Sequence, residues 1–203
     1  MKTICVDGII GAGKTTFVEG YTNYLRSRGK KVLTVFEPVQ DWIDNGMLAL
    51  FYKDQTRWGY TFQTMVYESR ITTINSKWTE YVKVQGIPDY VILDRSPATD
   101  ELFMKLLYED GNVTDVEFGL YLKWKDLWHS SLLIKPDRYV YINPSVSICM
   151  ERLQKRGREE EVGVLEEYQN KLAVKHDKMF LGRQDVACVG DKYTYVEVYE
   201  KLR

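Results

Sequence analysis

The fold is decided by residues 1–16, which read MKTICVDGIIGAGKTT. The apolar run 3–6 predicts a buried strand, and an apolar rhythm at helical spacing begins after Thr16. The loop between them has the spacing G-x-x-x-x-G-K-[ST] in the strand–loop–helix context that this motif requires. The expected phosphate-binding residues are Gly8, Gly11, Ala12, Gly13, Lys14, Thr15 and Thr16. We therefore predict a loop that binds a nucleoside triphosphate.

Each part of this loop has a physical role. Glycines let backbone N–H groups turn toward phosphate oxygens, and the helix that follows adds the partial positive charge of its N-terminus. Lys14 is expected to reach the outer phosphates, and the hydroxyl of Thr15 is expected to ligate Mg²⁺. The alternative is a glycine-rich turn that carries a lysine by chance, and the two correct flanks count against it.

Composition is that of a soluble globular protein. The chain has 203 residues, 44% hydrophobic and 28% charged, so we expect one domain over residues 1–203. The 28 lysines and arginines balance 29 acids, which favours neither nucleic acid nor an anionic membrane as a partner. The sequence shows no signal peptide and no apolar run of membrane-spanning length. A cytoplasmic or nuclear location is expected.

Strands that alternate with helices predict an α/β fold of three layers, in which helices flank a parallel sheet of five strands. The expected strands are residues 3–6, 31–36, 89–93, 138–142 and 185–189. The expected helices are residues 16–28, 41–53, 57–81, 97–109, 114–134, 145–155, 164–181 and 193–203.

Glu37 stands at the carboxyl end of the second expected strand, because Pro38 cannot continue the ladder. Ligands of open α/β sheets bind at this edge. An alcohol that accepts a phosphoryl group benefits from a base that takes its proton. A phosphate acceptor would instead require arginine, and the residue before Glu37 is Phe36. A surface glutamate at a strand end is the alternative.

Several further landmarks resemble those of the deoxyribonucleoside kinases, and the similarity runs over nearly the whole chain. They are E-P-V-x-x-W from Glu37 to Trp42, Y-x-D from Tyr52, and F-Q at Phe62 and Gln63. The resemblance implies a P-loop kinase fold, ATP as the phosphate donor and a small deoxynucleoside as the acceptor. It also implies that Glu37 is the general base, that Gln63 binds the edge of the nucleobase, that Phe62 or Trp42 bounds it, and that Tyr52 contacts the 3′-hydroxyl.

The triplet Asp94-Arg95-Ser96 ends the third expected strand. The family more often has Glu-Arg-Ser, and Asp-Arg-Ser occurs in its bacterial members that resemble deoxyadenosine kinases. A carboxylate at a strand end can hold Mg²⁺ or its waters, so Asp94 joins Thr15 as a candidate metal ligand. By resemblance, Arg95 reaches the 5′-hydroxyl and the catalytic glutamate. A structural ion pair is the alternative for this Asp-Arg sequence.

The charge run from Arg156 resembles the lid of the family, and we expect a lid at residues 156–163. Arg156 and Arg158 would neutralise charge on the transferring phosphoryl group. By resemblance, Glu161 is a partner of the 3′-hydroxyl and Arg152 packs on the base of the donor. A solvated charge run is the alternative.

Two positions bear on the choice of nucleobase. Arg70 and Asp100 match an Arg-Asp pair that family members acting on deoxycytidine or deoxypurines carry, so deoxyadenosine, deoxyguanosine or deoxycytidine is favoured. Met104 stands where the family often has a phenylalanine that stacks on the base, and Val66 is a residue that members accepting thymidine can carry. A thymidine kinase of the same family is therefore the first alternative.

Two other classes share the phosphate loop. A thymidylate kinase would need arginine before Glu37 and a glycine-rich turn after Pro38, and the sequence has neither. A switch GTPase would need a guanine-reading N-K-x-D stretch, which is absent, and a non-enzymatic NTP-binding switch is the least favoured interpretation. By analogy with the homodimers of the family, apolar faces of residues 57–81 and 114–134 are expected to pair two chains.

Overall fold

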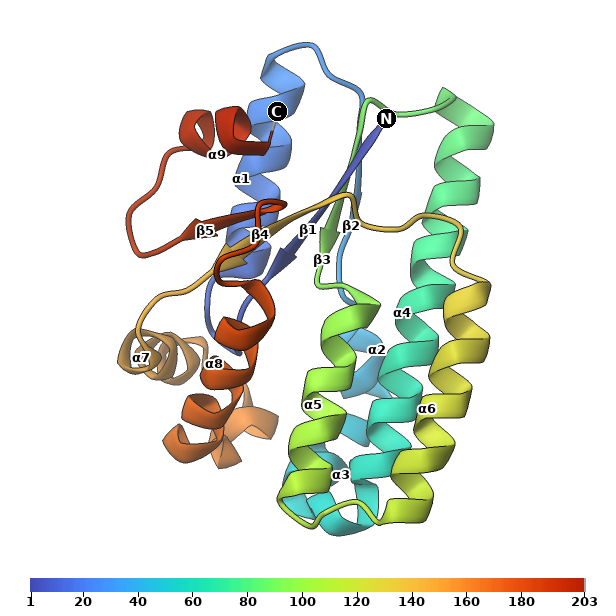
Figure 1. Cartoon of the computed structure of the whole chain (residues 1–203), viewed down its shortest axis with the longest axis vertical. Coiled ribbons are helices and arrows are strands. Elements are labelled where there is room, and N and C mark those ends of the chain that lie inside the picture. The colour runs from blue at the N-terminus through green and yellow to red at the C-terminus, as the bar shows by residue number, and fades with distance from the viewer. Residues whose placement is uncertain (203) are drawn as a thin grey trace.

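The computed structural model describes residues 1–202 (Figure 1). Its strands are β1 (Lys2–Asp7), β2 (Val32–Val35), β3 (Tyr90–Asp94), β4 (Arg138–Ile142) and β5 (Val186–Val189). All their pairings are parallel, and the strand order is β2-β3-β1-β4-β5. The expectation of a five-stranded parallel sheet flanked by helices is confirmed.

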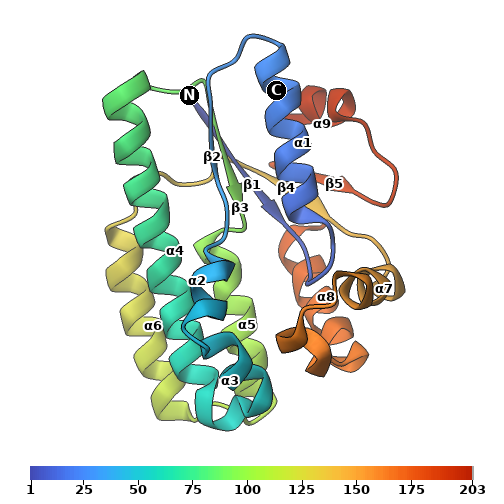
Figure 2. The ribbon, with the colours of Figure 1, turned by 180° about the vertical axis from the view of Figure 1, so that it is seen from behind.

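The helices follow the expected order with revised boundaries. They are α1 (Lys14–Ser27), α2 (Val39–Asp44), α3 (Met47–Lys53), α4 (Gln55–Gln85), α5 (Pro97–Glu109), α6 (Asp115–Ser130), α7 (Val146–Arg156), the 3₁₀ helix η1 (Glu159–Gly163), α8 (Glu166–Phe180) and α9 (Tyr195–Leu202). Figures 1 and 2 show α4, α5 and α6 side by side as a bundle, with α7 and α8 in a separate group. Among residues 1–202, no helix has the length and hydrophobicity needed to cross a membrane.

Each face of the sheet has its own hydrophobic core, because alternate residues of a strand point to opposite faces. On one face, Cys5 and Leu93 pack with Val66 and Ile71 of α4. On the other face, Ile4 packs in a cluster with side chains of α1, α8 and α9. The sheet is therefore the middle layer of three.

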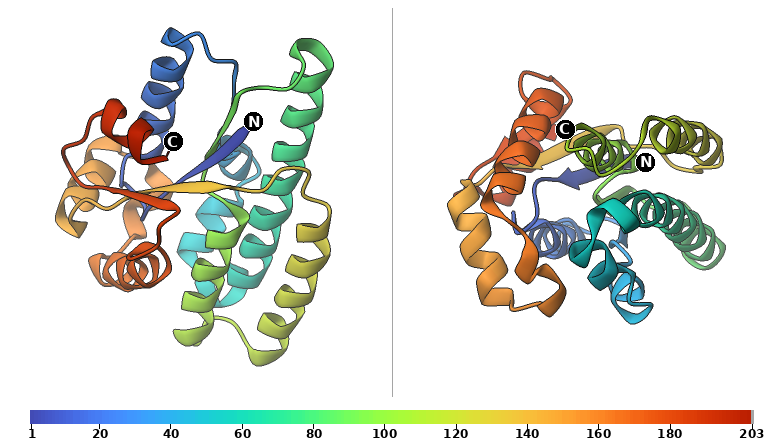
Figure 3. Two further views of the ribbon diagram at one scale, coloured as in Figure 1. Left: turned by 45° about the horizontal axis from the view of Figure 1, so that its top comes forward. Right: turned by 90° about the horizontal axis from the view of Figure 1, so that it is seen from below.

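The order of the strands indicates where a ligand is expected to bind. β1 lies between β3 and β4, so the sheet extends from it in both directions. Open α/β sheets bind ligands at such a switch point, outside the carboxyl ends of the strands. Figure 3 shows, in its view from below, α7 and α8 on one side and the helices α2 to α6 on the other.

Three expected helices differ from the structure, and the one over residues 114–134 ends already at Ser130. The single helix over residues 41–53 is wrong, because Gly46 adopts a φ of 73° and separates α2 from α3. The helix over residues 57–81 is too short, since Asp54 caps its start by accepting a hydrogen bond from the backbone N–H of Arg57, and the helix continues to Gln85. No large apolar side chain of residues 57–81 is fully exposed, and Trp58, Tyr60 and Trp78 are half-buried, so the apolar face expected there stays a prediction.

Candidate active site

A cavity of about 790 Å³ lies at the carboxyl edge of the sheet. It joins the loop after β1 to the ends of β2 and β3, and it continues between α2, α3, α4 and α5. Nearly all of the expected site residues line it: Gly11, Ala12, Gly13, Lys14, Thr15, Thr16, Glu37, Trp42, Tyr52, Phe62, Gln63, Val66, Arg70, Asp94, Arg95, Asp100, Arg152, Arg156, Arg158 and Glu161. The fold thus brings together residues that are distant in the sequence.

The loop after β1 is shaped by close backbone contacts. A Cβ added to Gly8 would lie 2.5 Å from the carbonyl oxygen of Ile142, and one added to Gly11 would lie 2.5 Å from that of Cys149. Both distances are impossible for a side chain, so glycine is required at these two positions. Gly13, with a φ of 95°, is the N-cap of α1. The loop therefore leads directly into a helix N-terminus, which is a favourable place for phosphate.

Lys14, Thr15 and Asp94 form the polar floor of the cavity. The hydroxyl of Thr15 donates a hydrogen bond of 2.8 Å to Oδ2 of Asp94. Oδ1 of Asp94 is buried and has no hydrogen-bond partner among residues 1–202. Lys14 is buried, and burial together with the charge of Arg95 lowers its pKa. A lysine charge and a carboxylate oxygen without a partner in the same place suit phosphates and a divalent cation.

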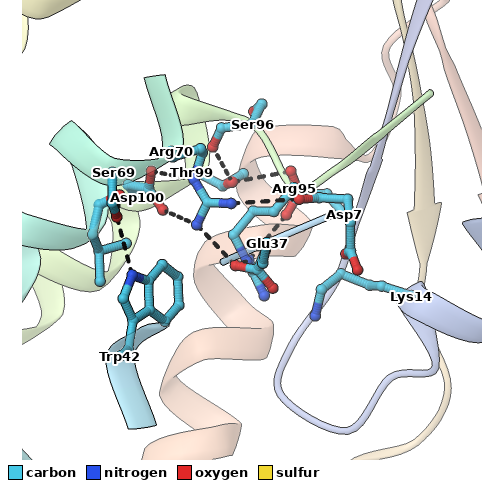
Figure 4. Close-up of polar contacts among 12 residues, drawn as sticks. Asp7, Lys14, Glu37, Trp42, Ser69, Arg70, Arg95, Ser96, Thr99 and Asp100 are labelled. Carbon is cyan, nitrogen blue, oxygen red and sulfur yellow. Dashed lines mark hydrogen bonds and ion pairs between the residues drawn. The ribbon is translucent and has the colours of Figure 1, made fainter. Parts of the chain in front are cut away.

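Glu37 lies between two buried arginines (Figure 4). Its Oε1 is 2.8 Å from Nη2 of Arg70 and 3.3 Å from Nε of Arg95. Arg70 is in turn bidentate to Asp100, with bonds of 2.7 Å and 2.9 Å. The expected Arg70–Asp100 pair exists, and the contact of Arg95 with Glu37 exists as well. The contact of Arg70 with Glu37 is an addition that the sequence does not predict.

The neighbouring charges shift the pKa values of Glu37 and Asp94 in opposite directions. Burial raises the pKa of Glu37, but Arg70, Arg95 and Lys14 outweigh that effect and lower the pKa to about 2. Burial and the negative charge of Glu37 raise the pKa of Asp94 to about 6. Glu37 is therefore ionised at neutral pH, which is the form in which a carboxylate can accept a proton.

The other half of the cavity is aromatic. Phe62 stacks on Phe51 with ring centroids 4.5 Å apart, and its edge meets Trp42 at 5.9 Å. The indole N–H of Trp42 donates to the hydroxyl of Ser69 at 3.0 Å, which fixes the orientation of that ring. Gln63 is only 3% exposed, and no group of residues 1–202 forms a hydrogen bond with its side-chain amide. The donor and acceptor of that amide can face a planar polar ligand.

Three residues of the segment 156–163 line the cavity as well: Arg156, Arg158 and Glu161. Arg156 and Arg158 both form ion pairs with Glu161, and the bond from Arg158 is 3.2 Å long. Arg152, on α7, donates a hydrogen bond of 2.8 Å to the carbonyl oxygen of Ala12 in the phosphate loop. Four charged side chains therefore share the cavity with the loop that is expected to bind phosphate.

Two of the expected site residues do not line the cavity. Met104 is fully buried in the hydrophobic core, and the neighbouring residue Phe103 lines the cavity instead. Successive side chains of an α-helix point about 100° apart, so Phe103 faces the cavity while Met104, the position expected to contact the nucleobase, faces the hydrophobic core. Gly8 lies at the base of the loop against Ile142 and shapes the loop from behind.

Sequence reasoning also missed several residues of the site. Asp7 and Thr99 are buried behind the cavity wall, where Thr99 donates to Asp7 and Asp7 forms an ion pair with Arg95. The position of Asp7 just before the phosphate loop is the signal that could have found it. The cavity is further lined by Val39, Leu48, Phe51, Phe103, Tyr168, Asp191 and Tyr193.

The cavity has a phosphate loop at one end and aromatic side chains at the other, and the ionised Glu37 carboxylate also lines it. Such a cavity can hold two substrates next to each other. That arrangement defines the class of P-loop kinases. The family model "Deoxynucleoside kinase" matches residues 4–198, so the chain belongs to the deoxynucleoside kinase family.

Relatives with known names agree with this assignment. The chain is 34% identical over 178 residues to a probable deoxycytidine kinase of Fowlpox virus, an alignment that covers 87% of this chain and 71% of the relative. It is 32% identical to deoxycytidine kinase 2 of Gallus gallus, with 87% and 73% covered. Mitochondrial thymidine kinase 2 of Homo sapiens is 30% identical, with 89% and 64% covered. The protein is therefore a kinase whose substrates are a deoxynucleoside and a nucleotide phosphate donor.

Proposed function

We propose that this protein transfers the γ-phosphoryl group of ATP to the 5′-hydroxyl of a deoxynucleoside in nucleotide salvage, and that deoxycytidine, deoxyadenosine or deoxyguanosine is preferred. The observation that carries the proposal is the position of the Glu37 carboxylate. It lies where the aromatic half of the cavity meets Lys14, Thr15 and Asp94. A base at that junction can act on a hydroxyl group that faces the phosphate loop.

The acceptor is assigned to the aromatic half. Phe62 and Trp42 supply flat apolar surface on which a nucleobase packs at low entropic cost. Gln63 offers one donor and one acceptor to the edge of the base. Tyr52 and Glu161 line the same cavity and are assigned to the 3′-hydroxyl of the sugar.

In the proposed reaction, Glu37 accepts the proton of the 5′-hydroxyl while the hydroxyl oxygen attacks the terminal phosphorus of the donor. Lys14 holds the outer phosphates, and Arg95 keeps Glu37 ionised and in place. We assign segment 156–163 as a lid whose Arg156 and Arg158 neutralise charge on the phosphoryl group in transfer. This role requires both arginines to exchange Glu161 for phosphate oxygens.

The polar floor also fits Mg²⁺. Its candidate ligands are the hydroxyl of Thr15 and the carboxylate of Asp94, whose Oδ1 lacks a partner among residues 1–202. Within the same residues, no three His, Cys, Asp or Glu side chains converge on one point. In sites of this kind Mg²⁺ takes most of its ligands from substrate phosphates and water. When bound, the ion would neutralise phosphate charge and help to hold the donor.

The metal assignment predicts a specific defect for Thr15→Ala. Loss of the hydroxyl should raise the Mg²⁺ concentration that gives half-maximal activity by about tenfold, which corresponds to about 1.4 kcal/mol. Thr15→Ser keeps the hydroxyl and should remain within about threefold of the wild type. The measurement is a Mg²⁺ titration of initial rates at saturating ATP. Equal half-maximal concentrations for the alanine and serine variants would contradict the assignment.

The base preference rests on the Arg70–Asp100 pair, which lines the cavity beside Val66. Buried donors and acceptors of this kind suit the polar edge of cytosine or a purine better than the methyl group of thymine. Thymidine remains the second candidate acceptor, because Val66 leaves apolar surface in the same part of the cavity and one of the relatives is a thymidine kinase.

The decisive experiment is to measure ADP production from ATP with a panel of four deoxynucleosides and their monophosphates. We expect activity with deoxynucleosides, deoxycytidine or a deoxypurine to give the highest kcat/KM, and no activity with monophosphates. A preference for thymidine would move the assignment to the second candidate. Turnover of monophosphates alone would overturn the proposal.

A homodimer is proposed on the outer face of α6. Val116, Leu120, Trp124 and Leu127 are exposed at helical spacing and form an apolar stripe. Residues 114–134, which the family analogy assigns to the dimer interface, therefore expose an apolar surface. Residues 57–81 have no large apolar side chain that is fully exposed. Light scattering after size-exclusion chromatography separates a monomer of 23.8 kDa from a dimer.

A further inference from the structure

Arg95 is held in an unusual backbone conformation. Its φ is 67°, and it is the one residue other than glycine with a positive φ among residues 1–202. A side chain in this left-handed region costs of order 1 kcal/mol or more and persists only when the surroundings enforce it. Arg95 is also only 4% exposed, so its environment is made almost entirely of protein groups.

Four polar contacts fix the guanidinium group of Arg95, which also lies over the ring of Phe103 at 4.7 Å. Nε faces Oε1 of Glu37 at 3.3 Å, and Nη2 donates to the carbonyl oxygen of Gly8 at 2.9 Å. Nη1 donates to Oδ1 of Asp7 at 3.0 Å and lies 3.4 Å from Nε2 of His176. The edge that carries Nε therefore faces the cavity, and the opposite edge is anchored behind it.

His176 is suited to accept a hydrogen bond from Arg95. Its Nδ1 lies 2.8 Å from the carbonyl oxygen of Leu172, and a carbonyl only accepts, so Nδ1 carries the proton. Nε2 is then the unprotonated nitrogen and points at Nη1 of Arg95. Burial and the charge of Arg95 also lower the pKa of His176 to about 3, which keeps the ring neutral.

The second carboxylate oxygen of Asp7, which does not contact Arg95, also has a buried partner. This oxygen, Oδ2, lies 3.0 Å from the hydroxyl of Thr99, which also lies 2.8 Å from the carbonyl oxygen of Ser96 and shares its one proton between these two acceptors, and both Asp7 and Thr99 are fully buried. Asp7 ends β1, Thr99 lies on α5 and His176 lies on α8, so three elements of the fold converge behind Arg95. None of the three residues lines the cavity or can touch a substrate there.

We propose that Asp7 and His176 are positioning residues that orient Arg95 toward Glu37. The proposal rests on the proposed function, because it gives Arg95 a part in phosphoryl transfer. Without the acceptor at Nε2, Nη1 keeps only Asp7 as a partner, so the guanidinium group is held less firmly in the orientation that points Nε at the carboxylate. Misplacement of a catalytic group by an ångström can cost about 100-fold in rate.

Two substitutions of His176 separate this role from packing. The asparagine side chain in His176→Asn keeps a donor for the carbonyl oxygen of Leu172 but has no acceptor near Arg95. The longer glutamine side chain in His176→Gln extends an amide oxygen to the place that Nε2 occupies. His176→Asn should lower kcat by about tenfold to 100-fold and change both KM values by less than about threefold. His176→Gln should stay within about threefold of the wild type.

Tyr141→Phe is the matched control for stability. This substitution removes a hydrogen bond of 2.8 Å from β4 to Asp177 of α8, keeps the aromatic ring that stacks on His176, and leaves the polar partners of Arg95 in place. We expect a lower Tm with an unchanged kcat. Thr99→Val is a second, nearly isosteric variant that loosens Asp7, and it should lower kcat by about threefold or more without a change in KM.

The side-chain NMR signal of Arg95 Nε–H supplies a readout that does not depend on activity. It should shift in the His176→Asn and Thr99→Val variants and stay in place in Tyr141→Phe. Equal loss of kcat in the asparagine and glutamine variants, or an unchanged kcat in both His176→Asn and Thr99→Val, would overturn the proposal. An inactive wild-type enzyme in the deoxynucleoside panel would instead overturn the proposed function, and the NMR comparison would still report on the orientation of Arg95.

Discussion

Glu37→Gln is expected to lower kcat for the deoxynucleoside by about 100-fold or more, which is the usual scale for the loss of a positioned base. A factor of 100 corresponds to about 2.7 kcal/mol in the activation free energy. The glutamine has nearly the shape of the glutamate but cannot take the proton of the 5′-hydroxyl. The measurement is kcat and KM for both substrates at saturating Mg²⁺.

The pH profile distinguishes a base from a counter-ion. The pKa of Glu37 is lowered to about 2, so the wild type should show no fall in kcat/KM from titration of this residue between pH 8 and pH 6. In Glu37→Gln, hydroxide from solvent must take the proton, and the residual rate should rise with pH over the same range.

The competing explanation is that Glu37 only neutralises Arg70 and Arg95. Arg70 keeps Asp100 and Arg95 keeps Asp7 after the substitution, so neither cation is left without a partner. In that case Glu37→Gln would lower the free energy of unfolding and raise KM, while kcat stayed near the wild-type value. Denaturant unfolding of both proteins provides the comparison.

The parts of the site that could be predicted from the sequence are those that local rules determine. Gly13, Lys14 and Thr15 belong to a motif whose spacing alone fixes a turn into a helix. Glu37 and Asp94 each end a strand, and the carboxyl ends of parallel strands share one edge, so their proximity follows from the topology.

The contacts that could not be predicted depend on how helices pack. Arg70 reaches Glu37 because α4 packs against β2, and no spacing in the sequence encodes that packing. The same is true of Arg95 and His176, which meet because α8 packs against α5, the helix that follows β3 and Arg95. Met104 was expected to contact the nucleobase, but it lies in the hydrophobic core, and the preceding residue on α5, Phe103, lines the cavity.

The contact between Arg70 and Glu37 changes what is expected when Arg70 and Asp100, which we propose to select the base, are replaced. In the double variant Arg70→Met with Asp100→Ala, the ratio of kcat/KM for thymidine to that for deoxycytidine should rise by about tenfold or more, because apolar space replaces buried polar groups. The kcat for every nucleoside should fall as well, since Glu37 loses the partner at 2.8 Å. The nucleoside panel measures both effects, and an unchanged ranking would show that the pair does not choose the base.

Stability of the same variants tests the electrostatics of the pair. Asp100→Ala alone leaves the buried charge of Arg70 with Glu37 as its remaining acid partner, and we expect it to lower the free energy of unfolding by about 3 kcal/mol. The double variant removes the charge together with its counter-ion, so it should be more stable than Asp100→Ala although it carries one more substitution. Denaturant titration of the two single variants and the double variant gives the coupling. An additive result would mean that Glu37 alone compensates Arg70, and Asp100 would then serve the base and not the charge.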